Sequence, residues 1–218
     1  MGKIIFDRLL AFTALIMLMP FFALIALMIR KDGGPAFFRQ KRVGLKGRPF
    51  SIIKFRTMIP DAEKYGGQIT SGHDPRITTV GGFLRKSKMD ELPQLINVFL
   101  GQMSLVGPRP EVPYYVEKWS AEDRKILLSV RPGITDYASL YYSNEQEILA
   151  CADDPEECYI QKIMPEKLRL YRKYAQNHNL WLDFRIIVAT LLKLAGLNAA
   201  MILPEIRKMP VSAEDIQV

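Results

Sequence analysis

Residues 9–29 read LLAFTALIMLMPFFALIALMI, an uncharged stretch with one proline, Pro20, near its middle. About 20 apolar residues form a helix long enough to cross a bilayer. Because proline lacks a backbone N–H, it kinks or breaks a helix, and each half then reaches roughly 15 Å, the depth of one leaflet. Lys3 precedes the stretch and Lys31 follows it, and basic flanks favour the cytoplasm. The pattern predicts a re-entrant helix hairpin, with both ends on one membrane face, in preference to a spanning helix.

A secretory signal peptide is the other alternative for this stretch. Its apolar core would be shorter, and no small-residue cleavage site follows here. We therefore assign residues 1–32 to a re-entrant membrane helix and residues 33–218 to a catalytic domain on the cytoplasmic face.

The composition of the chain indicates which kinds of partner molecule it favours. The chain has 218 residues, 49% of them hydrophobic, and a net charge of +7. That charge suits anionic partners: phosphates, nucleotides, nucleic acid or an anionic membrane surface. The two cysteines lack the spacing of a redox or zinc pair, and the two histidines lie far apart, so a zinc site is not expected.

The pattern after the apolar stretch predicts an α+β fold that is mostly helical. Two short segments rich in aromatic and β-branched residues flank a turn, which predicts a small β-hairpin. The segment 181–194 is apolar over more than half its circumference, which fits either an amphipathic helix in the membrane interface or a buried core helix. The expected elements are strands in 35–43 and 49–58, a loop-like stretch at 60–80, and helices in 89–100, 156–177 (broken near Pro165) and 181–194.

The acidic pair Asp90-Glu91 is the main candidate for chemistry. Pro93 is tolerated only in the first turn of a helix, which places the pair at a helix start, with Asp90, Gln94 and Asn97 on one polar face. Free N–H groups and the helix dipole there favour an ionised carboxylate, so we expect Asp90 to act as a nucleophile on phosphorus. Glu91 could hold Mg²⁺ or transfer a proton. The alternative is a pair that only caps the helix.

Cationic residues surround the pair in the sequence. A site that transfers a phosphate needs converging cations, and arginine makes forked contacts to phosphate oxygens. Arg109 lies between Pro108 and Pro110, so a stiff loop would hold it. A single cation is more often a solvated surface charge, but a cluster of many cations around one acidic pair favours a binding site. The cations just upstream of the pair or on the predicted hairpin are Arg39, Lys41, Arg42, Lys54, Arg56, Arg85, Lys86 and Lys88.

Two non-enzymatic classes fit parts of the sequence. Basic residues interleaved with aromatic ones could stack nucleic-acid bases, yet no nucleic-acid motif is present. A non-catalytic, membrane-anchored basic scaffold would account for the apolar stretch but gives no reason for an acidic pair among cations. We therefore expect an enzyme with no nucleic-acid partner.

An ordered set of motifs resembles the bacterial sugar transferase family, the small monotopic phosphoglycosyl transferases. No single motif is decisive, but their order is specific and covers most of the chain. The motifs are FRQKRVG at 38–44, KFRTM at 54–58, DPRIT at 74–78, LRK at 84–86, DELPQL at 90–95, MSLVGPRP at 103–110, RPGIT at 131–135 and a late pattern from Asp183 to Thr190.

The resemblance implies transfer of a phosphosugar onto a lipid carrier. Asp90 would attack the β-phosphate of a UDP-sugar, release UMP and hold the phosphosugar covalently, and polyprenyl (undecaprenyl) phosphate would then accept it. Asp90 and Glu91 would hold Mg²⁺, and the family's proline-broken re-entrant helix agrees with the interpretation of Pro20. The residues implied in binding phosphate or nucleotide are Arg109, Lys54, Arg56, Arg85, Arg76, Arg39, Gln40, Pro108 and Pro110.

The resemblance also implies a location and a pathway class. It predicts a bacterial protein on the cytoplasmic face of the cytoplasmic membrane, in contact with phospholipid and compatible with a homo-oligomer, that initiates glycoconjugate synthesis. The chain departs from the family at Gln102, where an acidic residue is usual, and at Met19, where a serine usually precedes the proline. After RPGIT it has Asp136-Tyr137 where Gly-Trp is common.

Overall fold

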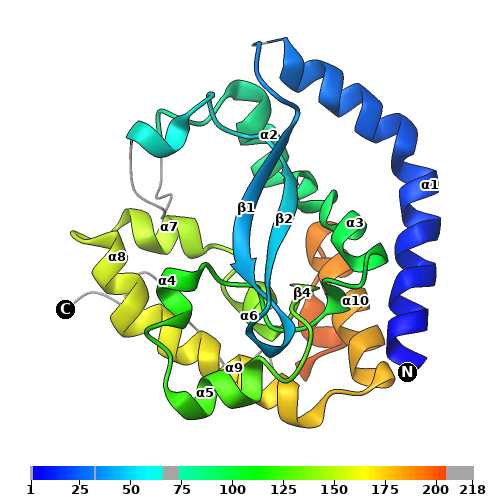
Figure 1. The fold of residues 1–218 in the computed structure, drawn as a ribbon, viewed down its shortest axis with the longest axis vertical. Coiled ribbons are helices and arrows are strands. Elements are labelled where there is room, and N and C mark those ends of the chain that lie inside the picture. The colour runs from blue at the N-terminus through cyan, green and yellow to red at the C-terminus, as the bar shows by residue number, and fades with distance from the viewer. Residues whose placement is uncertain (1, 32, 66–73, 205–218) are drawn as a thin grey trace.

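The computed structural model describes residues 2–31, 33–65 and 74–204. These residues form a mostly helical domain with two separate two-stranded sheets and a long N-terminal helix along one side (Figure 1). The mostly helical α+β class expected from the sequence is confirmed.

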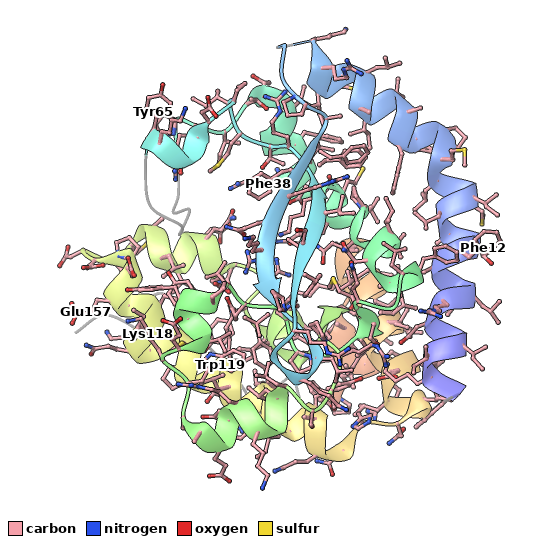
Figure 2. The ribbon with its side chains drawn as sticks, viewed as in Figure 1. Phe12, Phe38, Tyr65, Lys118, Trp119 and Glu157 are labelled. Atoms are coloured by element: carbon pink, nitrogen blue, oxygen red, sulfur yellow. The ribbon has the colours of Figure 1, made fainter. Side chains whose placement is uncertain are left out.

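The long helix is α1, Gly2–Arg30, which contains Pro20. Figure 1 shows that α1 stays one helix but bends along its length. It is the one helix among the described residues with the length and composition to cross a membrane. Figure 2 shows its side chains extending on the side that faces away from the domain. The large exposed apolar residues on α1 are Ile5, Phe6, Leu9, Leu10, Phe12, Ile16, Met17, Met19, Phe21, Leu24, Leu27 and Met28.

Both ends of α1 are attached to the same domain. Near its N-terminus, the Lys3 ammonium donates to Asp183 at 2.6 Å. Near its C-terminus, the buried Arg56 guanidinium donates to the Ile29 carbonyl at 3.1 Å. Because an arginine at a helix C-terminus satisfies its free carbonyls, this contact also caps the helix. The helix therefore lies against the domain along its length.

The predicted hairpin is confirmed as an antiparallel pair, β1 (Phe37–Val43) and β2 (Pro49–Phe55), joined by the turn Leu45–Gly47. The loop-like stretch expected at 60–80 contains a short 3-10 turn, Ala62–Tyr65, and the start of α2, Thr79–Lys86. The part of that stretch between 66 and 73 lies outside the described residues.

The helix expected over 89–100 is divided into two elements. Met89–Glu91 forms a 3-10 turn and α3 spans Gln94–Phe99, with Pro93 as the residue that precedes α3. The expected polar face is the buried one, because Asp90, Gln94 and Asn97 are at most 9% exposed. Asn97 explains why, since its side chain accepts from the Ile53 N–H at 3.0 Å and donates to the Ser51 carbonyl at 2.8 Å. The amide thus bonds the free edge of β2 as a third strand would.

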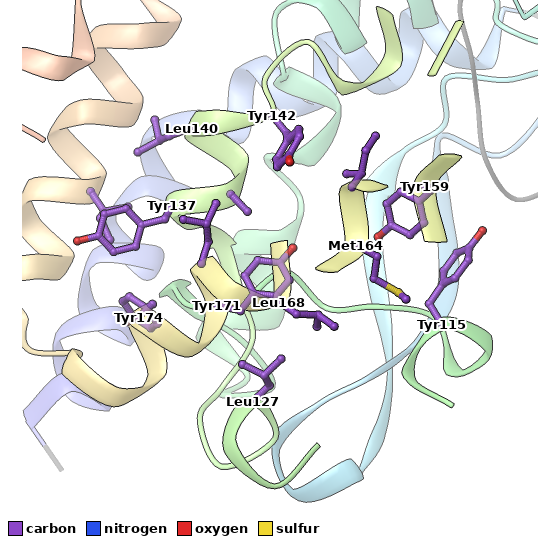
Figure 3. Close-up of a cluster of buried hydrophobic side chains, with 14 of the residues drawn as sticks. Tyr115, Leu127, Tyr137, Leu140, Tyr142, Tyr159, Met164, Leu168, Tyr171 and Tyr174 are labelled. Carbon is purple, nitrogen blue, oxygen red and sulfur yellow. The ribbon is translucent and has the colours of Figure 1, made fainter. Parts of the chain in front are cut away.

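The rest of the chain closes the domain. A short parallel sheet joins β3 (Ser104–Val106) to β4 (Gly133–Thr135). Tyrosines and aliphatic side chains from the helices around it make the main core, as Figure 3 shows for Tyr137, Tyr171 and Tyr174. The helices are α4 (Pro113–Val116), α5 (Ala121–Leu127), α6 (Tyr137–Tyr141), α7 (Glu145–Ala150), α8 (Pro155–Cys158), α9 (Met164–Asn177) and α10 (Leu180–Leu194). A π-helical segment, Tyr159–Ile163, marks the break expected near Pro165, and a 3-10 turn, Ala199–Met201, follows α10.

For the segment 181–194 the sequence predicts either an amphipathic helix in the membrane interface or a buried core helix, and α10 has features of both. One face of α10 is in the core, where Ile186 and Ala189 are fully buried. Its other face exposes Leu180, Trp181, Phe184, Leu191 and Leu194. A helix that is apolar on both faces packs on the domain with one and offers the other to an apolar environment.

We expect Asn97→Ala to lower the free energy of unfolding by about 2 kcal/mol, because it removes the side-chain partner of two partly buried backbone groups of β2. Thermal or urea unfolding of the detergent-solubilised protein would measure this. Asn144→Ala is the matched control, since Asn144 is exposed and its side chain caps nothing. Equal effects of the two substitutions would contradict the role assigned to Asn97.

Candidate active site

Three segments meet at the acidic pair. The 3-10 turn Met89–Glu91 presents Asp90 and Glu91, strand β2 contributes Lys54, and the loop after β3 contributes Arg109. Lys88, just before the turn, has a left-handed backbone (φ 57°), which reverses the chain between α2 and the pair. Residues far apart in the sequence are therefore brought to one place.

Glu91 is held from two sides. The Lys54 ammonium donates to Glu91 Oε1 at 2.7 Å, and the Arg109 guanidinium donates Nη1 to Oε2 at 3.0 Å and Nη2 to Oε1. Burial alone would raise the pKa of Glu91, but the charges of Arg109 and Lys54 and their hydrogen bonds hold that pKa well below its usual range. Glu91 therefore stays ionised and orients both cations.

Asp90 differs from Glu91 in its contacts and in the direction of its pKa shift. It is only 9% exposed, and within the described residues it makes neither a hydrogen bond nor an ion pair. Burial and the neighbouring charge of Glu91 raise the pKa of Asp90, while Lys54, Arg109 and Arg85 pull it down. The pair occupies a 3-10 turn before α3, so it precedes the α-helix rather than starting it as the sequence predicts. What keeps Asp90 available is the surrounding cations.

Arg85 adds a donor beside Asp90. Its Nε donates to the Thr57 hydroxyl at 2.8 Å, and its charge acts on Asp90. Its Nη1 atom is buried and has no hydrogen-bond partner among the residues that the structure describes. A buried guanidinium N–H without a partner is costly, so it is positioned to bind an anionic ligand.

The Pro-flanked loop holds Arg109 as the sequence suggested. Pro108 accepts from the Gly133 N–H at 2.9 Å, and Pro110 accepts from the Arg42 guanidinium at 3.0 Å. Gly107 must be glycine, because a Cβ there would lie 2.3 Å from the carbonyl oxygen of Arg131. The two prolines thus contribute their carbonyls to the fold and place Arg109 between them.

Four of the expected phosphate-binding residues are not brought to the pair. Arg56 is buried and donates to the carbonyls of Pro35, Ile29 and Met58 at the end of α1. Arg76 makes a forked contact to Asp74. Gln40 accepts from Arg42 at 2.6 Å. Arg39 is exposed and pairs with Ile53, so it points to the strand face opposite Lys54.

Glu111, directly after the Pro-Arg-Pro run, belongs to a buried polar group that the sequence motifs did not indicate. Glu111 is buried, accepts from the Tyr159 hydroxyl at 2.8 Å and lies 3.6 Å from the Arg42 guanidinium. Tyr171, whose buried hydroxyl has no partner among the described residues, lies close enough to Arg109 to contribute to the raised pKa of that guanidinium, of which Glu91 is the main cause. The segment 143–166 therefore supports the site through Tyr159. A glutamate directly after the Pro-Arg-Pro run was the signal available.

The donor set allows a magnesium ion without forming a complete cage. No cluster of three or more histidine, cysteine or acidic side chains able to hold a metal occurs in the described part of the chain. Mg²⁺ commonly binds through one or two carboxylates together with substrate phosphate oxygens. Asp90 has its oxygens free for this, whereas Glu91 is shared with two cations. The pair fits an ion that arrives with a phosphorylated ligand.

We expect Asp90→Asn and Glu91→Gln to change stability in opposite directions near neutral pH. Since the folded state raises the pKa of Asp90, its contribution is present below the unfolded pKa of about 3.9 and lost as pH rises through the folded value. The uncharged Asp90→Asn variant should therefore melt above wild type at neutral pH, with the difference vanishing near pH 4.

Glu91 has a lowered folded pKa, so its contribution is present above the unfolded pKa of about 4.3 and is lost on acidification. Glu91→Gln should melt below wild type at neutral pH. Thermal unfolding of the three proteins at both pH values measures this, and a midpoint for Asp90→Asn as low as that of Glu91→Gln would refute the assignment.

Comparisons with known proteins identify the family of the chain. The chain matches the family described as bacterial sugar transferase over residues 1–196. It is 36% identical over 203 residues to a UDP-glucose:undecaprenyl-phosphate glucose-1-phosphate transferase of Xanthomonas campestris, covering 91% of this chain and 40% of that protein. It is 34% identical over 192 residues to the protein of the same name in Escherichia coli, covering 86% and 39%.

A third relative is similar in length. The exopolysaccharide production protein ExoY of Rhizobium meliloti is 33% identical over 207 residues, covering 88% of this chain and 84% of ExoY. The chain thus spans about two fifths of the first two relatives and most of the third. With the family matched over 196 of 218 residues, this chain belongs to the bacterial sugar transferase family.

Proposed function

We propose that this protein transfers a sugar-1-phosphate from a UDP-sugar to polyprenyl phosphate and releases UMP. The observation that carries the proposal is the difference between two adjacent carboxylates. Glu91 is neutralised by Lys54 and Arg109, while Asp90 has cations around it but no direct partner in the described structure. Lys54 and Arg109 contact Glu91 on one side and can contact a diphosphate on the other. The free carboxylate of Asp90 beside them can act as a nucleophile.

The first step is attack by a carboxylate oxygen of Asp90 on the β-phosphorus of the UDP-sugar. A bond from Asp90 to phosphorus forms, the bond from that phosphorus to the bridging oxygen breaks, and UMP leaves with the electron pair. Arg109 and Arg85 are the guanidinium groups that can stabilise charge on the phosphoryl oxygens and the leaving phosphate.

The second step returns Asp90 to its starting state. A phosphate oxygen of the polyprenyl carrier attacks the phosphorus of the Asp90 acyl phosphate, the bond to Asp90 breaks, and the carboxylate is regenerated. The product is a polyprenyl diphosphate sugar. The names of the Xanthomonas and Escherichia relatives support this acceptor, with undecaprenyl phosphate as the carrier.

Glu91 acts mainly as a positioning residue in this proposal. Its lowered pKa makes proton transfer unfavourable near neutral pH, whereas its contacts orient Lys54 and Arg109 toward the bound diphosphate. Asp90, with the diphosphate oxygens, would hold Mg²⁺, which neutralises developing charge when bound.

The membrane arrangement forms part of the proposal. Both ends of α1 contact one domain, and α1 and α10 expose apolar side chains. A bent helix fixed at both ends fits a re-entrant, monotopic arrangement at the cytoplasmic face of the bacterial membrane. There the soluble UDP-sugar and the lipid phosphate can meet at headgroup level, in contact with phospholipid.

We expect wild type to release UMP from at least one of a panel of UDP-sugars with Mg²⁺ and polyprenyl phosphate, and Asp90→Asn to lose about 10³-fold or more of that rate. When lipid is left out, wild type should carry one phosphosugar per chain, measured as a mass increase that Asp90→Asn lacks. Asp153→Asn, at an exposed carboxylate away from the pair, is the control. Folded wild type with no release across the panel would count against the proposal, and release by Asp90→Asn against the nucleophile.

The topology has its own test. We expect single cysteines at Lys3 and Lys31, in a Cys151→Ser background, to react with a membrane-impermeant thiol reagent only from the cytoplasmic face of oriented vesicles. A spanning helix would expose one of them on each face. Labelling of the two positions from opposite faces would exclude the re-entrant arrangement without affecting the chemical proposal.

A further inference from the structure

A cavity lies at the turn of the β-hairpin, away from the acidic pair. It has a volume of about 350 Å³ and is formed between the hairpin turn, the loop after α3 and Arg131. Lys54, which contacts Glu91, and Pro49, which lines the cavity, are five residues apart on β2, about 16 Å at 3.3 Å per residue, so the cavity and the acidic pair lie toward different ends of this strand. The side chains that line it are Leu45, Lys46, Arg48, Pro49, Phe50, Gln102 and Arg131, with backbone of Gly44 and Gly101.

The lining is cationic and contains no acidic residue. Among the described residues, the side chains of Lys46 and Arg48 make no hydrogen bond or ion pair. Arg131 donates its Nε to the Gly101 carbonyl at 3.0 Å, which leaves its two terminal nitrogens for another partner. Three like charges around one cavity repel one another, and an anion would relieve that repulsion.

The cations are carried on a fixed turn. Lys46 and Gly47 both have left-handed backbones, with φ of 56° and 73°. A non-glycine residue rarely adopts this conformation unless the surrounding structure imposes it. Here the Lys46 N–H donates to the Leu128 carbonyl at 2.7 Å, and the Gly44 N–H donates to the Arg48 carbonyl at 2.9 Å. The hairpin turn is therefore held in place before any ligand binds.

An acidic residue at position 102 could have balanced the positive charge of the cavity, but this chain has Gln102 there. Its side-chain oxygen accepts from the Asn97 amide at 2.7 Å, so the side chain is tied to the interior of the fold. The position is one where the sequence motif departs from its usual acidic residue. With an amide there, the cavity keeps its full positive charge.

We propose that this cavity is a second phosphate-binding site, separate from the acidic pair, in which Arg48 and Arg131 make forked contacts and Lys46 supplies a further charge. Two guanidinium groups and an ammonium around one cavity suit a phosphate monoester or diester. The phosphate can come from a phospholipid headgroup or from a soluble phosphate. Arg8 of α1, which donates to the Leu100 carbonyl at 3.3 Å beside Gly101, connects the cavity to the apolar helix.

Isothermal titration of the full detergent-solubilised chain with two probes tests the site. Inorganic phosphate stands for the soluble source, and a short-chain phosphatidylglycerol, used below its micelle concentration, stands for the headgroup. We expect Arg48→Gln to weaken binding of at least one probe about tenfold, because one charge-assisted hydrogen bond is lost. Gln102→Glu should weaken the same binding about tenfold, because it adds a negative charge at the cavity. The probe whose binding is weakened more identifies the source of the phosphate.

Two controls separate the result from general charge effects and from the acidic pair. Lys125→Gln removes one exposed positive charge elsewhere and should leave binding unchanged. Arg109→Gln alters the proposed catalytic site and should leave binding at the cavity intact, while UMP release by Arg48→Gln tests the catalytic proposal separately. Binding of both probes that is unaffected by Arg48→Gln and Gln102→Glu, or that is lost in Arg109→Gln alone, would overturn the proposal.

Discussion

The contact of Glu91 with Lys54 and Arg109 is the interaction on which the site depends. It joins a 3-10 turn, a strand and a loop that are separated by up to 55 residues in the chain. A buried carboxylate is unfavourable unless it is paired, and buried cations are unfavourable for the same reason. The three groups satisfy one another, and the arrangement then leaves the adjacent carboxylate of Asp90 among positive charges without a partner of its own.

The two carboxylates differ because only Glu91 contacts the cations directly. Glu91 keeps its charge because two cations contact it, and Asp90 has a raised pKa because it is buried beside that charge. A carboxylate that loses solvation on folding is destabilising in itself. Such a cost is typical of reactive positions, where binding of ligand or substrate compensates for it.

The same fold connects the site to the apolar helix. Lys3 of α1 contacts Asp183, which also accepts from the Tyr174 hydroxyl at 2.6 Å. Asp7 accepts from the Ser104 hydroxyl at 2.7 Å at the start of β3, the strand that leads to Arg109. Because the carboxylates of Asp183 and Asp7 are buried and each has a hydrogen-bond partner, they fix the helix to the elements that carry the site. The orientation of the site relative to α1 is therefore set by the fold.

Local sequence determined the elements but not the contacts among them. The apolar stretch, the hairpin at 37–55, the acidic pair and the Pro-flanked Arg109 follow from hydrophobic period, turn residues and the restricted backbone of proline, all of which act over a few residues. Even the break before Pro165 is local, because proline at a helix start is a local constraint.

Tertiary structure decided which charges serve the site. Arg56 and Arg39 carry the same positive charge as Lys54, yet Arg56 caps α1 and Arg39 lies on the opposite strand face. Gln94 and Asn97 form a polar face that is buried, because Asn97 bonds the edge of β2. The pKa of Asp90 likewise depends on burial and on neighbours distant in the chain. Charge and polarity belong to a residue, but burial and pairing depend on the packing of segments that are not adjacent in sequence.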